Sequence, residues 1–120
     1  MIPMTPSILI VDDHPSFRAT ARALLQSEGY TIVGEAVDGA SALTAARELH
    51  PEVVLLDVQL PDTDGFAVAA ELARSDDPPA IVLTSSRDAS DFGPLIAESG
   101  ARGFVPKGEL CARTLTDVLE

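Results

Sequence analysis

The stretch Val53-Val54-Leu55-Leu56-Asp57 decides the fold of this chain. Four consecutive apolar residues, with no polar residue between them, are typical of a strand that is buried on both faces. Similar short runs, rich in β-branched residues and nearly all apolar, occur at residues 8–11, 31–33, 81–83 and 104–105. Between the runs, apolar residues recur at helical spacing, with polar residues on the opposite side. The chain therefore predicts five strands that alternate with five helices.

An alternation of strands and helices predicts a parallel sheet with right-handed crossovers and helices on both faces. The residues expected at helix ends agree with this α/β class. Pro15 suits a first helical turn, Asp38 or Ser41 suits the start of a second helix, and Gly29 and Gly100 fall just past helix ends.

The fourth helix is the weakest part of the pattern, because Gly93-Pro94 interrupts the segment 87–99. Residues 76–79, Asp-Asp-Pro-Pro, are expected to form a turn before the fourth strand. With 120 residues, and with no repeat or linker, we expect a single domain that can bury its own core.

Composition excludes several classes of protein. Nineteen acidic against eight basic residues give a formal net charge of −11, which makes the chain by itself a poor binder of nucleic acid. Its apolar runs are far shorter than the roughly 20 residues of a membrane span, and its N-terminus does not resemble a signal peptide. We therefore expect a cytoplasmic protein with no membrane partner. Cys111 is the single cysteine, which excludes an internal disulfide, and it is expected to be a small apolar residue of a helix.

Polar side chains follow four of the five predicted strands. They are Asp12 and Asp13 after the first strand, Asp57 after the third, Thr84, Ser85 and Ser86 after the fourth, and Lys107 after the fifth. Ligands of open α/β sheets bind beyond the carboxyl ends of the strands, so these residues are expected to share one site. Lys107 is also the only lysine of the chain, whose other seven basic residues are arginines.

Three carboxylates in one cleft must either hold protons or bind a cation. Mg²⁺ suits them because it prefers oxygen ligands, and Mn²⁺ could substitute for it. A lysine and a hydroxyl beside such an ion can neutralise the charge of a transferring phosphoryl group. A carboxylate can itself be the nucleophile, and Asp57, at the end of the central strand, is the natural candidate.

Each residue also has a simpler interpretation. Asp13, which precedes Pro15, could merely cap a helix. Asp57 could be a turn residue, Thr84 a strand-end hydroxyl and Lys107 a solvated charge. Their joint placement at four strand ends favours a functional site.

Four motifs in this order resemble bacterial two-component response-regulator receiver domains. They are Ile10-Val11-Asp12-Asp13-His14-Pro15-Ser16-Phe17-Arg18, Val54-Leu55-Leu56-Asp57-Val58-Gln59-Leu60-Pro61-Asp62-Thr63-Asp64-Gly65, Ile81-Val82-Leu83-Thr84-Ser85 and Gly103-Phe104-Val105-Pro106-Lys107. The resemblance covers nearly the whole chain. It implies a flavodoxin-like (βα)5 three-layer sandwich with the strand order 2-1-3-4-5.

The resemblance also implies a phosphoacceptor and a metal site. Asp57 would take a phosphoryl group from a phosphohistidine of a sensor histidine kinase. Asp13, Asp57 and the backbone carbonyl of Gln59 would hold Mg²⁺, and Asp12 would orient the ion through a bound water. In this reading the domain is a signalling switch and not a turnover enzyme.

The remaining implied roles concern the switch. Lys107 would pair with Asp57 before the transfer and with a phosphoryl oxygen after it. Thr84 would move to the phosphoryl group, and the rotamer of Phe104 would follow, so that the fourth helix, fifth strand and fifth helix change surface. Ser85 would leave the approach path open, and Gln59 and Ser86 would flank the phosphoryl group and tune its hydrolysis.

Three details differ from, or limit, the family pattern. Phe104 lacks the hydroxyl of the tyrosine that many relatives carry, so its switching would depend on packing alone. Gly108 follows Lys107 where many relatives have proline, and a cis bond before a non-proline residue costs about 2.5 to 4 kcal/mol, so none is expected. Pro106 cannot donate to a ladder and is expected on an edge strand.

The residues of the first and last motifs resemble those of the NarL/LuxR subclass, which carries a helix-turn-helix output domain. We therefore interpret residues 1–120 as a receiver domain whose C-terminal DNA-binding output domain lies outside this chain, with a homodimer forming on phosphorylation. A stand-alone receiver in a phosphorelay is the alternative.

Four other classes fit less well. A calcium loop at residues 60–71 would place Leu60 where an oxygen ligand is needed. A haloacid-dehalogenase-like phosphatase expects an aspartate where Gln59 stands, and a flavodoxin-like FMN protein needs phosphate donors where Asp12 and Asp13 stand. A receiver that signals without phosphorylation would not need all of these groups.

Overall fold

Five parallel strands form one sheet in the order β2-β1-β3-β4-β5. The computed structural model describes residues 6–120. The strands are β1 (Ser7–Val11), β2 (Thr31–Ala36), β3 (Val53–Asp57), β4 (Ala80–Ser85) and β5 (Gly103–Pro106). The predicted α/β class and the strand order 2-1-3-4-5 are both confirmed.

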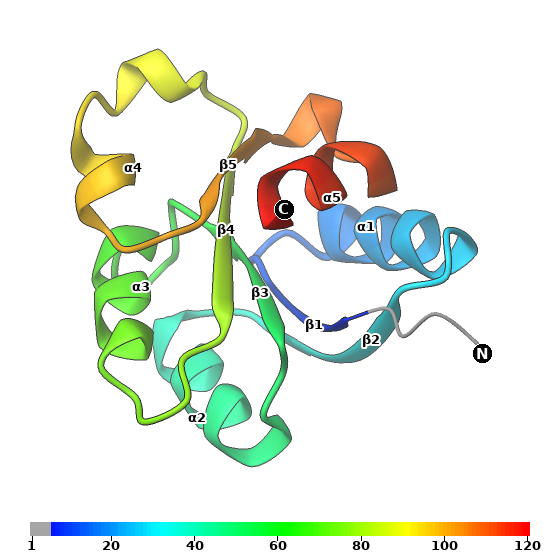
Figure 1. Ribbon diagram of the computed structural model, residues 1–120, viewed down its shortest axis with the longest axis horizontal. Helices are drawn as coiled ribbons and strands as arrows, with labels where there is room; N and C mark the ends of the chain where they lie inside the picture. Colours follow the sequence, from blue (N-terminus) through cyan, green and yellow to red (C-terminus); the bar gives the residue numbers. More distant parts are fainter. Residues whose placement is uncertain (1–5) are drawn as a thin grey trace.

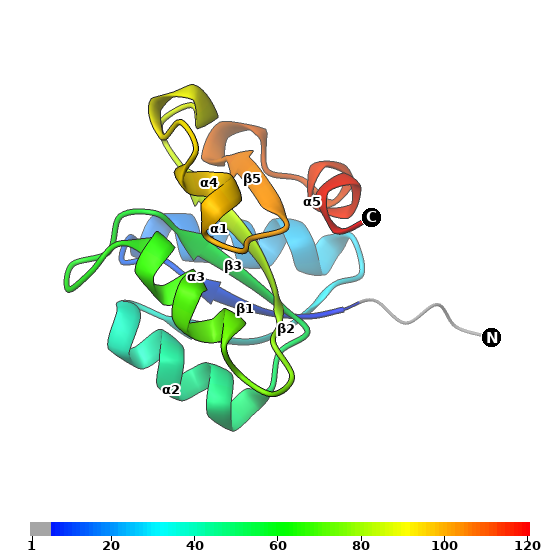
Figure 2. The same ribbon diagram turned by 60° about the vertical axis from the view of Figure 1, so that its left-hand side comes forward.

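Helices cover both faces of the sheet and make three layers (Figures 1 and 2). α1 (Pro15–Ser27) and α5 (Ala112–Leu119) lie on one face. α2 (Gly39–Leu49), α3 (Gly65–Ala73) and the short α4 (Leu95–Glu98) lie on the other. Two single 3₁₀ turns, η1 (Ala89–Asp91) and η2 (Lys107–Glu109), precede α4 and α5.

Alternate residues of the central strand enter two separate halves of the core. Val54 and Leu56 pack among the residues of α2 and α3, whereas Val53 and Leu55 pack among those of α1 and α5. All five residues of β3 are buried. A strand between two layers of helices has no solvent face, which explains its unbroken apolar sequence.

The expected helix-end residues occupy their places. Pro15 begins α1, and Asp38 is the N-cap of α2, where its side chain and that of Ser41 form a capping box. Gly29 and Gly100 follow helices with φ angles of 98° and 84°. Only glycine adopts this left-handed region without a steric cost.

The fourth crossover departs most from a regular (βα) unit. α4 has four residues and begins directly after Pro94, and Gly93 has a φ of 56°. The left-handed glycine ends the preceding turn and the proline can only start a new helix. The predicted interruption at this point is confirmed.

Two predictions from the sequence need correction. Cys111 is not an interior helix residue but the N-cap of α5, where its backbone N–H donates to Thr114 Oγ1 at 3.0 Å. Three residues expected after their strands lie inside them. Asp57 ends β3 and pairs with Thr84, and Thr84 and Ser85 are the last two residues of β4, where Ser85 pairs with Pro106.

Two smaller expectations are met. Pro106 ends the edge strand β5, and no peptide bond in residues 6–120 is cis. In the same part of the chain, no helix has the length and apolar character needed to cross a lipid bilayer.

Candidate functional site

The carboxylate of Asp57 lies at the carboxyl end of the central strand and is 3% exposed. Its Oδ2 accepts a hydrogen bond from Lys107 Nζ at 3.2 Å, and its Oδ1 accepts one from the backbone N–H of Gln59 at 3.2 Å. Burial, followed by the nearby charge of Asp12, raises the pKa of Asp57 above its ordinary value. The carboxylate is therefore held in one orientation and is more basic than an exposed aspartate.

Asp12 follows β1 and is completely buried. Its Oδ2 lies 2.6 Å from Lys107 Nζ. Its Oδ1 accepts the backbone N–H of His14 at 2.8 Å and lies 2.9 Å from His14 Nδ1. Arg18 of α1 donates to the Asp12 backbone carbonyl at 2.7 Å, which fixes the turn from β1 into α1.

Asp13 and His14 form the outer edge of the same cluster. The exposed fractions of their side chains are 37% and 63%, and His14 Nδ1 lies 3.2 Å from Asp13 Oδ1. The N-cap residue of α1 is His14, with no side-chain cap hydrogen bond. The simpler interpretation of Asp13 as a helix cap is therefore wrong.

Lys107 connects the two buried carboxylates. It begins η2, directly after β5, and its Nζ also lies 4.6 Å from the centre of the Phe17 ring. Burial by itself would lower the pKa of Lys107, but the carboxylates of Asp12 and Asp57 outweigh it, so the pKa lies above the ordinary value. The ammonium therefore stays charged. This role between two buried carboxylates explains why the chain has a lysine at this one position.

Thr84 lies beside Asp57 on the neighbouring strand, and its carbonyl accepts the Val58 N–H at 2.9 Å. The Thr84 side chain is buried, and its Oγ1 has no hydrogen-bond partner among residues 6–120. Ser85 is also buried, and its Oγ accepts the Arg87 N–H at 3.0 Å, whereas Ser86 is exposed. Buried hydroxyls are rarely left unpaired, so the free Thr84 hydroxyl calls for a functional explanation.

The loop after β3 is tied down at two points that sequence reasoning missed. Gly65 N donates to Val58 O at 2.6 Å, and a Cβ on Gly65 would lie 2.3 Å from the Asp57 carbonyl oxygen. Asp62 accepts the N–H groups of Gly39 and Ala40 at 2.8 and 3.0 Å, and these bonds lower its pKa. Together they hold the loop that carries Gln59 against the start of α2.

Phe104 lies on β5 at one end of a row of three aromatic rings. The ring centres are 5.8 Å apart between Phe104 and Phe92, and 5.6 Å apart between Phe92 and Phe66. The row joins β5, the segment before α4, and α3. Phe92 was missed from the sequence because its segment shows no regular periodicity.

The donor set fits a hard divalent cation. Three carboxyl groups, those of Asp12, Asp13 and Asp57, face a single ammonium, which leaves two formal negative charges uncompensated. Ligand atoms of these three residues and of His14 all lie within 4.8 Å of one another. Oxygen donors and a double negative charge are what Mg²⁺ prefers, and the unpaired Thr84 hydroxyl leaves a hydrogen-bond donor for a phosphoryl oxygen.

Comparison with known proteins agrees with this geometry. The family model described as "Response regulator receiver domain" matches residues 8–119. The DNA-binding response regulator MtrA of Mycolicibacterium smegmatis is 41% identical over 106 residues, which cover 87% of this chain and 45% of MtrA. This chain spans about half the length of the curated relatives it matches.

Two solved structures share the fold closely. A two-component response regulator of the LuxR family from Aurantimonas sp. SI85-9A1 has a TM-score of 0.86 and 31% identity, over 97% of this chain and 84% of its own. The NarL signal receiver domain from Mycobacterium tuberculosis has a TM-score of 0.84 and 34% identity, over 98% of both chains. This chain belongs to the response-regulator receiver-domain family, and its relatives include LuxR- and NarL-type response regulators.

Proposed function

We propose that this chain is a phosphorylation switch in which Asp57 accepts a phosphoryl group from the phosphohistidine of a sensor histidine kinase. One observation carries the proposal: a buried carboxylate is held by Lys107 at the end of the central strand, beside a buried threonine hydroxyl that has no partner. By resemblance to the family, we propose that this reaction takes place in the cytoplasm.

The residues around Asp57 prepare its carboxylate for attack. Lys107 and the Gln59 N–H hold the two oxygens, and the raised pKa makes the carboxylate a stronger base than a solvated aspartate. A carboxylate oxygen then forms a bond to phosphorus, the P–N bond of the phosphohistidine breaks, and its electron pair returns to the imidazole. Positioning and charge neutralisation supply most of the catalysis in such a transfer.

The remaining residues would hold the product. Lys107 would move from the carboxylate to a phosphoryl oxygen, and the Thr84 hydroxyl would donate to another. Asp13, Asp57 and the Gln59 carbonyl would hold Mg²⁺ or Mn²⁺, with Asp12 acting through water, and the ion would neutralise charge on the phosphoryl oxygens. Ser85, as a small residue, would leave the approach path open, and Gln59 and Ser86 would control access of water to the acyl phosphate.

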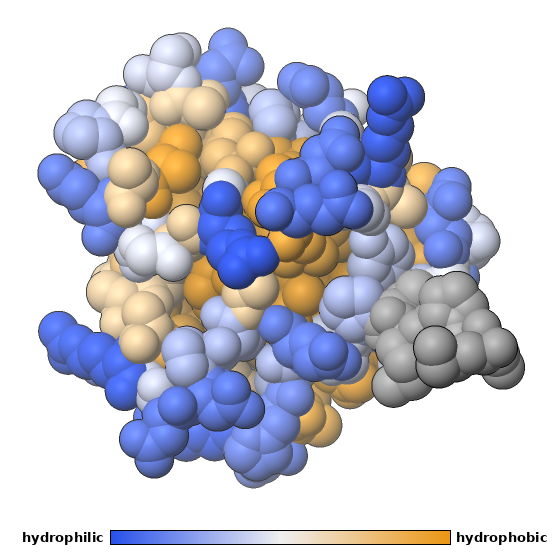
Figure 3. Space-filling view, viewed as in Figure 1, coloured by the Kyte–Doolittle hydropathy of each residue, from blue (hydrophilic) through white to orange (hydrophobic). Residues whose placement is uncertain are grey.

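The signal would leave the site through Phe104. Movement of the Thr84 hydroxyl would change the space available to the Phe104 ring. That ring packs at a tilt against Phe92, which in turn packs edge-on against Phe66. The affected surface is α4, β5 and α5, where apolar residues lie among charged ones (Figure 3). We propose that this surface controls transcription through a DNA-binding output domain, and that phosphorylation favours a homodimer.

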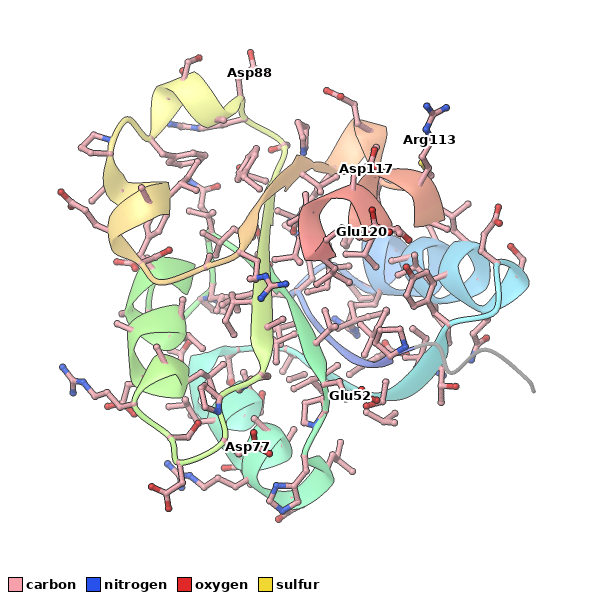
Figure 4. All side chains as sticks on the ribbon, viewed as in Figure 1. Glu52, Asp77, Asp88, Arg113, Asp117 and Glu120 are labelled. Carbon is pink, nitrogen blue, oxygen red and sulfur yellow. The ribbon has the colours of Figure 1, made fainter. Side chains whose placement is uncertain are left out.

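The test is chemical labelling. We expect the chain, incubated with Mg²⁺ and acetyl phosphate, to gain one phosphoryl group by intact-mass spectrometry, and Asp57→Asn to gain none. Asp77→Asn is the matched control. Asp77 lies just before β4, at the end of that strand away from Asp57 (Figure 4), so this variant should be labelled like the unmodified chain.

Equal labelling of Asp57→Asn would contradict the assignment of the phosphoacceptor. Steady release of phosphate from a phosphomonoester would instead indicate a phosphatase. A single phosphoryl group that is lost slowly supports the switch.

A further inference from the structure

The imidazole of His14 lies at the open edge of the acidic site, and the function proposed above gives it no role. Its Nδ1 is 2.9 Å from Asp12 Oδ1 and 3.2 Å from Asp13 Oδ1. The side chain is 63% exposed, so it is held beside the carboxylates by its hydrogen bond with Asp12 Oδ1 and its contact with Asp13, and not by burial.

The backbone fixes His14 in this position. Its N–H donates to Asp12 Oδ1 at 2.8 Å, and Pro15 follows it as the first residue of α1. A residue before proline is held in an extended conformation, and His14 has φ −91° and ψ 110°. The turn therefore places the backbone of His14 beside the cluster, and the contacts of Nδ1 with Asp12 and Asp13 orient the ring.

The spacing of the three atoms suits hydrogen bonds when no metal ion is bound, and it also suits neighbouring ligands of one metal ion. With metal–ligand bonds of about 2.1 Å, adjacent corners of an octahedron lie about 3.0 Å apart. The distances from His14 Nδ1 to the two carboxylate oxygens, 2.9 and 3.2 Å, lie on either side of this value. Asp57 provides a further oxygen within the same 4.8 Å cluster.

We propose that His14 is a nitrogen ligand that widens the metal preference of this site toward imidazole-accepting divalent cations such as Ni²⁺ and Co²⁺. The inference rests on the proposed function only in using the same acidic site. Mg²⁺ takes oxygen ligands and gains little from an imidazole, whereas affinity for a mixed nitrogen and oxygen set rises from Mn²⁺ through Co²⁺ and Ni²⁺ to Cu²⁺. His14 would thus let such ions compete with Mg²⁺ for Asp13 and Asp57.

The charge of the site agrees with this inference. Lys107 Nζ contacts Asp12 Oδ2 and Asp57 Oδ2, at 2.6 and 3.2 Å, whereas His14 Nδ1 contacts the other oxygen of Asp12, Oδ1. Asp13 has no basic side chain other than His14 within salt-bridge distance in the described part of the chain. A divalent cation between His14 and Asp13 would supply the missing positive charge.

The test compares Ni²⁺ alone with Mg²⁺ alone by isothermal titration calorimetry on the full chain. We expect His14→Asn to weaken Ni²⁺ binding about tenfold or more, because loss of even an outer-shell partner costs about that much. Mg²⁺ affinity should stay within about twofold because Mg²⁺ uses oxygen ligands. His50→Asn removes the other histidine, which lies at the C-terminal end of α2, and should change neither affinity. Asparagine is tolerated both at an N-cap and in the left-handed conformation of His50.

Proton NMR gives a second measurement, because the His14 ring signals would not respond to Ni²⁺ in this way if His14 had only a structural role. Ni²⁺ should shift ring signals of His14 far outside the diamagnetic range and leave those of His50 in place. Unchanged Ni²⁺ affinity in His14→Asn, or equal weakening of Ni²⁺ and Mg²⁺, would overturn the inference, since His14 would then only support the carboxylates.

Labelling with acetyl phosphate and Mg²⁺ separates this inference from the proposed function. Failure of the unmodified chain to be labelled would count against the phosphoryl switch, whereas the inference on His14 is decided by the Ni²⁺ comparison.

Discussion

At the scale of single residues, the side chain of Thr84 lowers the stability of the folded chain in a way that its proposed function explains. Its hydroxyl is buried and has no hydrogen-bond partner in the described chain. Burying an unpaired polar group costs about 1 to 3 kcal/mol. The cost is understandable if the hydroxyl waits for a phosphoryl oxygen, which is the role proposed here.

We therefore predict that Thr84→Val raises the free energy of unfolding by about 1 kcal/mol, because the unpaired hydroxyl is removed with little change in shape. Phosphorylation should then no longer alter the α4-β5-α5 surface. Urea denaturation measures the first effect, and NMR shifts of that surface with and without acetyl phosphate measure the second.

Thr116→Val is the matched control. The Thr116 hydroxyl shares a hydrogen bond of 2.5 Å with Tyr30, so its loss should destabilise the chain by about 1 kcal/mol. A comparable loss in Thr84→Val would show that the Thr84 hydroxyl is already satisfied in the resting protein.

At the scale of secondary-structure elements, an ion-pair network joins α1 to β2. The Glu35 carboxylate lies 3.0 Å from Arg18 Nε and 2.6 Å from Arg22 Nε. Arg22, followed by Arg18, lowers the pKa of Glu35 below its ordinary value of 4.5, although burial opposes this. Arg18 also holds the Asp12 carbonyl, so the network reaches the active end of the sheet.

The lowered pKa predicts a pH dependence. A carboxylate with a lower pKa in the folded state stabilises that state above its unfolded pKa of 4.5, and loses this contribution as the pH falls through the folded pKa. Glu35→Gln should therefore lower the free energy of unfolding by less than about 1 kcal/mol near neutral pH. The difference from the unmodified chain should shrink below pH 4.5.

Urea midpoints at neutral pH and on the acid side of pH 4.5 measure this effect. Glu48→Gln, at an exposed position of α2, should show no such difference. A difference that grows as the pH falls would refute the ion-pair explanation.

At the scale of the whole molecule, stability depends on burying the central strand between two helical layers. Leu55 of β3 is 1% exposed and packs toward α1 and α5, whereas Leu95 of α4 is 46% exposed. The same change of side chain should therefore have very different costs at the two positions.

We predict that Leu55→Ala lowers the free energy of unfolding by about 2 to 5 kcal/mol, because it removes apolar contacts and leaves a cavity. Leu95→Ala should stay within about 0.5 kcal/mol, as is usual for exposed positions. Chemical denaturation of both variants measures the difference, and similar losses would mean that α4 is far better packed than its exposure indicates.

Much of this architecture could be predicted from local features of the chain. Unbroken apolar runs such as Val53 to Leu56 indicate strands covered on both sides, and Pro15, Gly29 and Gly100 mark helix ends because their backbone preferences act locally. Motif resemblance then supplied the strand order, and the placement of Asp57 and Lys107 at strand ends indicated a shared site.

Other features depend on residues that are distant in sequence. Three such features are the bonds from Gly39 and Ala40 to Asp62, the close approach of Gly65 to the Asp57 carbonyl, and the tilted packing of Phe92 against Phe104. All of them arise only when separate elements pack together. No periodicity or turn preference encodes such contacts.

The sequence by itself determined the fold class, the family and the residues at the strand ends, because backbone preference, burial pattern and motif order are local properties of the chain. Only the tertiary structure decided that Lys107 bridges Asp12 as well as Asp57, that the Thr84 hydroxyl is left unpaired, and that His14 faces the carboxylates. The first two facts depend on distances of a few ångströms between side chains from different strands, and the third depends on the orientation of the His14 ring in the turn after β1. Packing sets such details, and a linear pattern cannot express them.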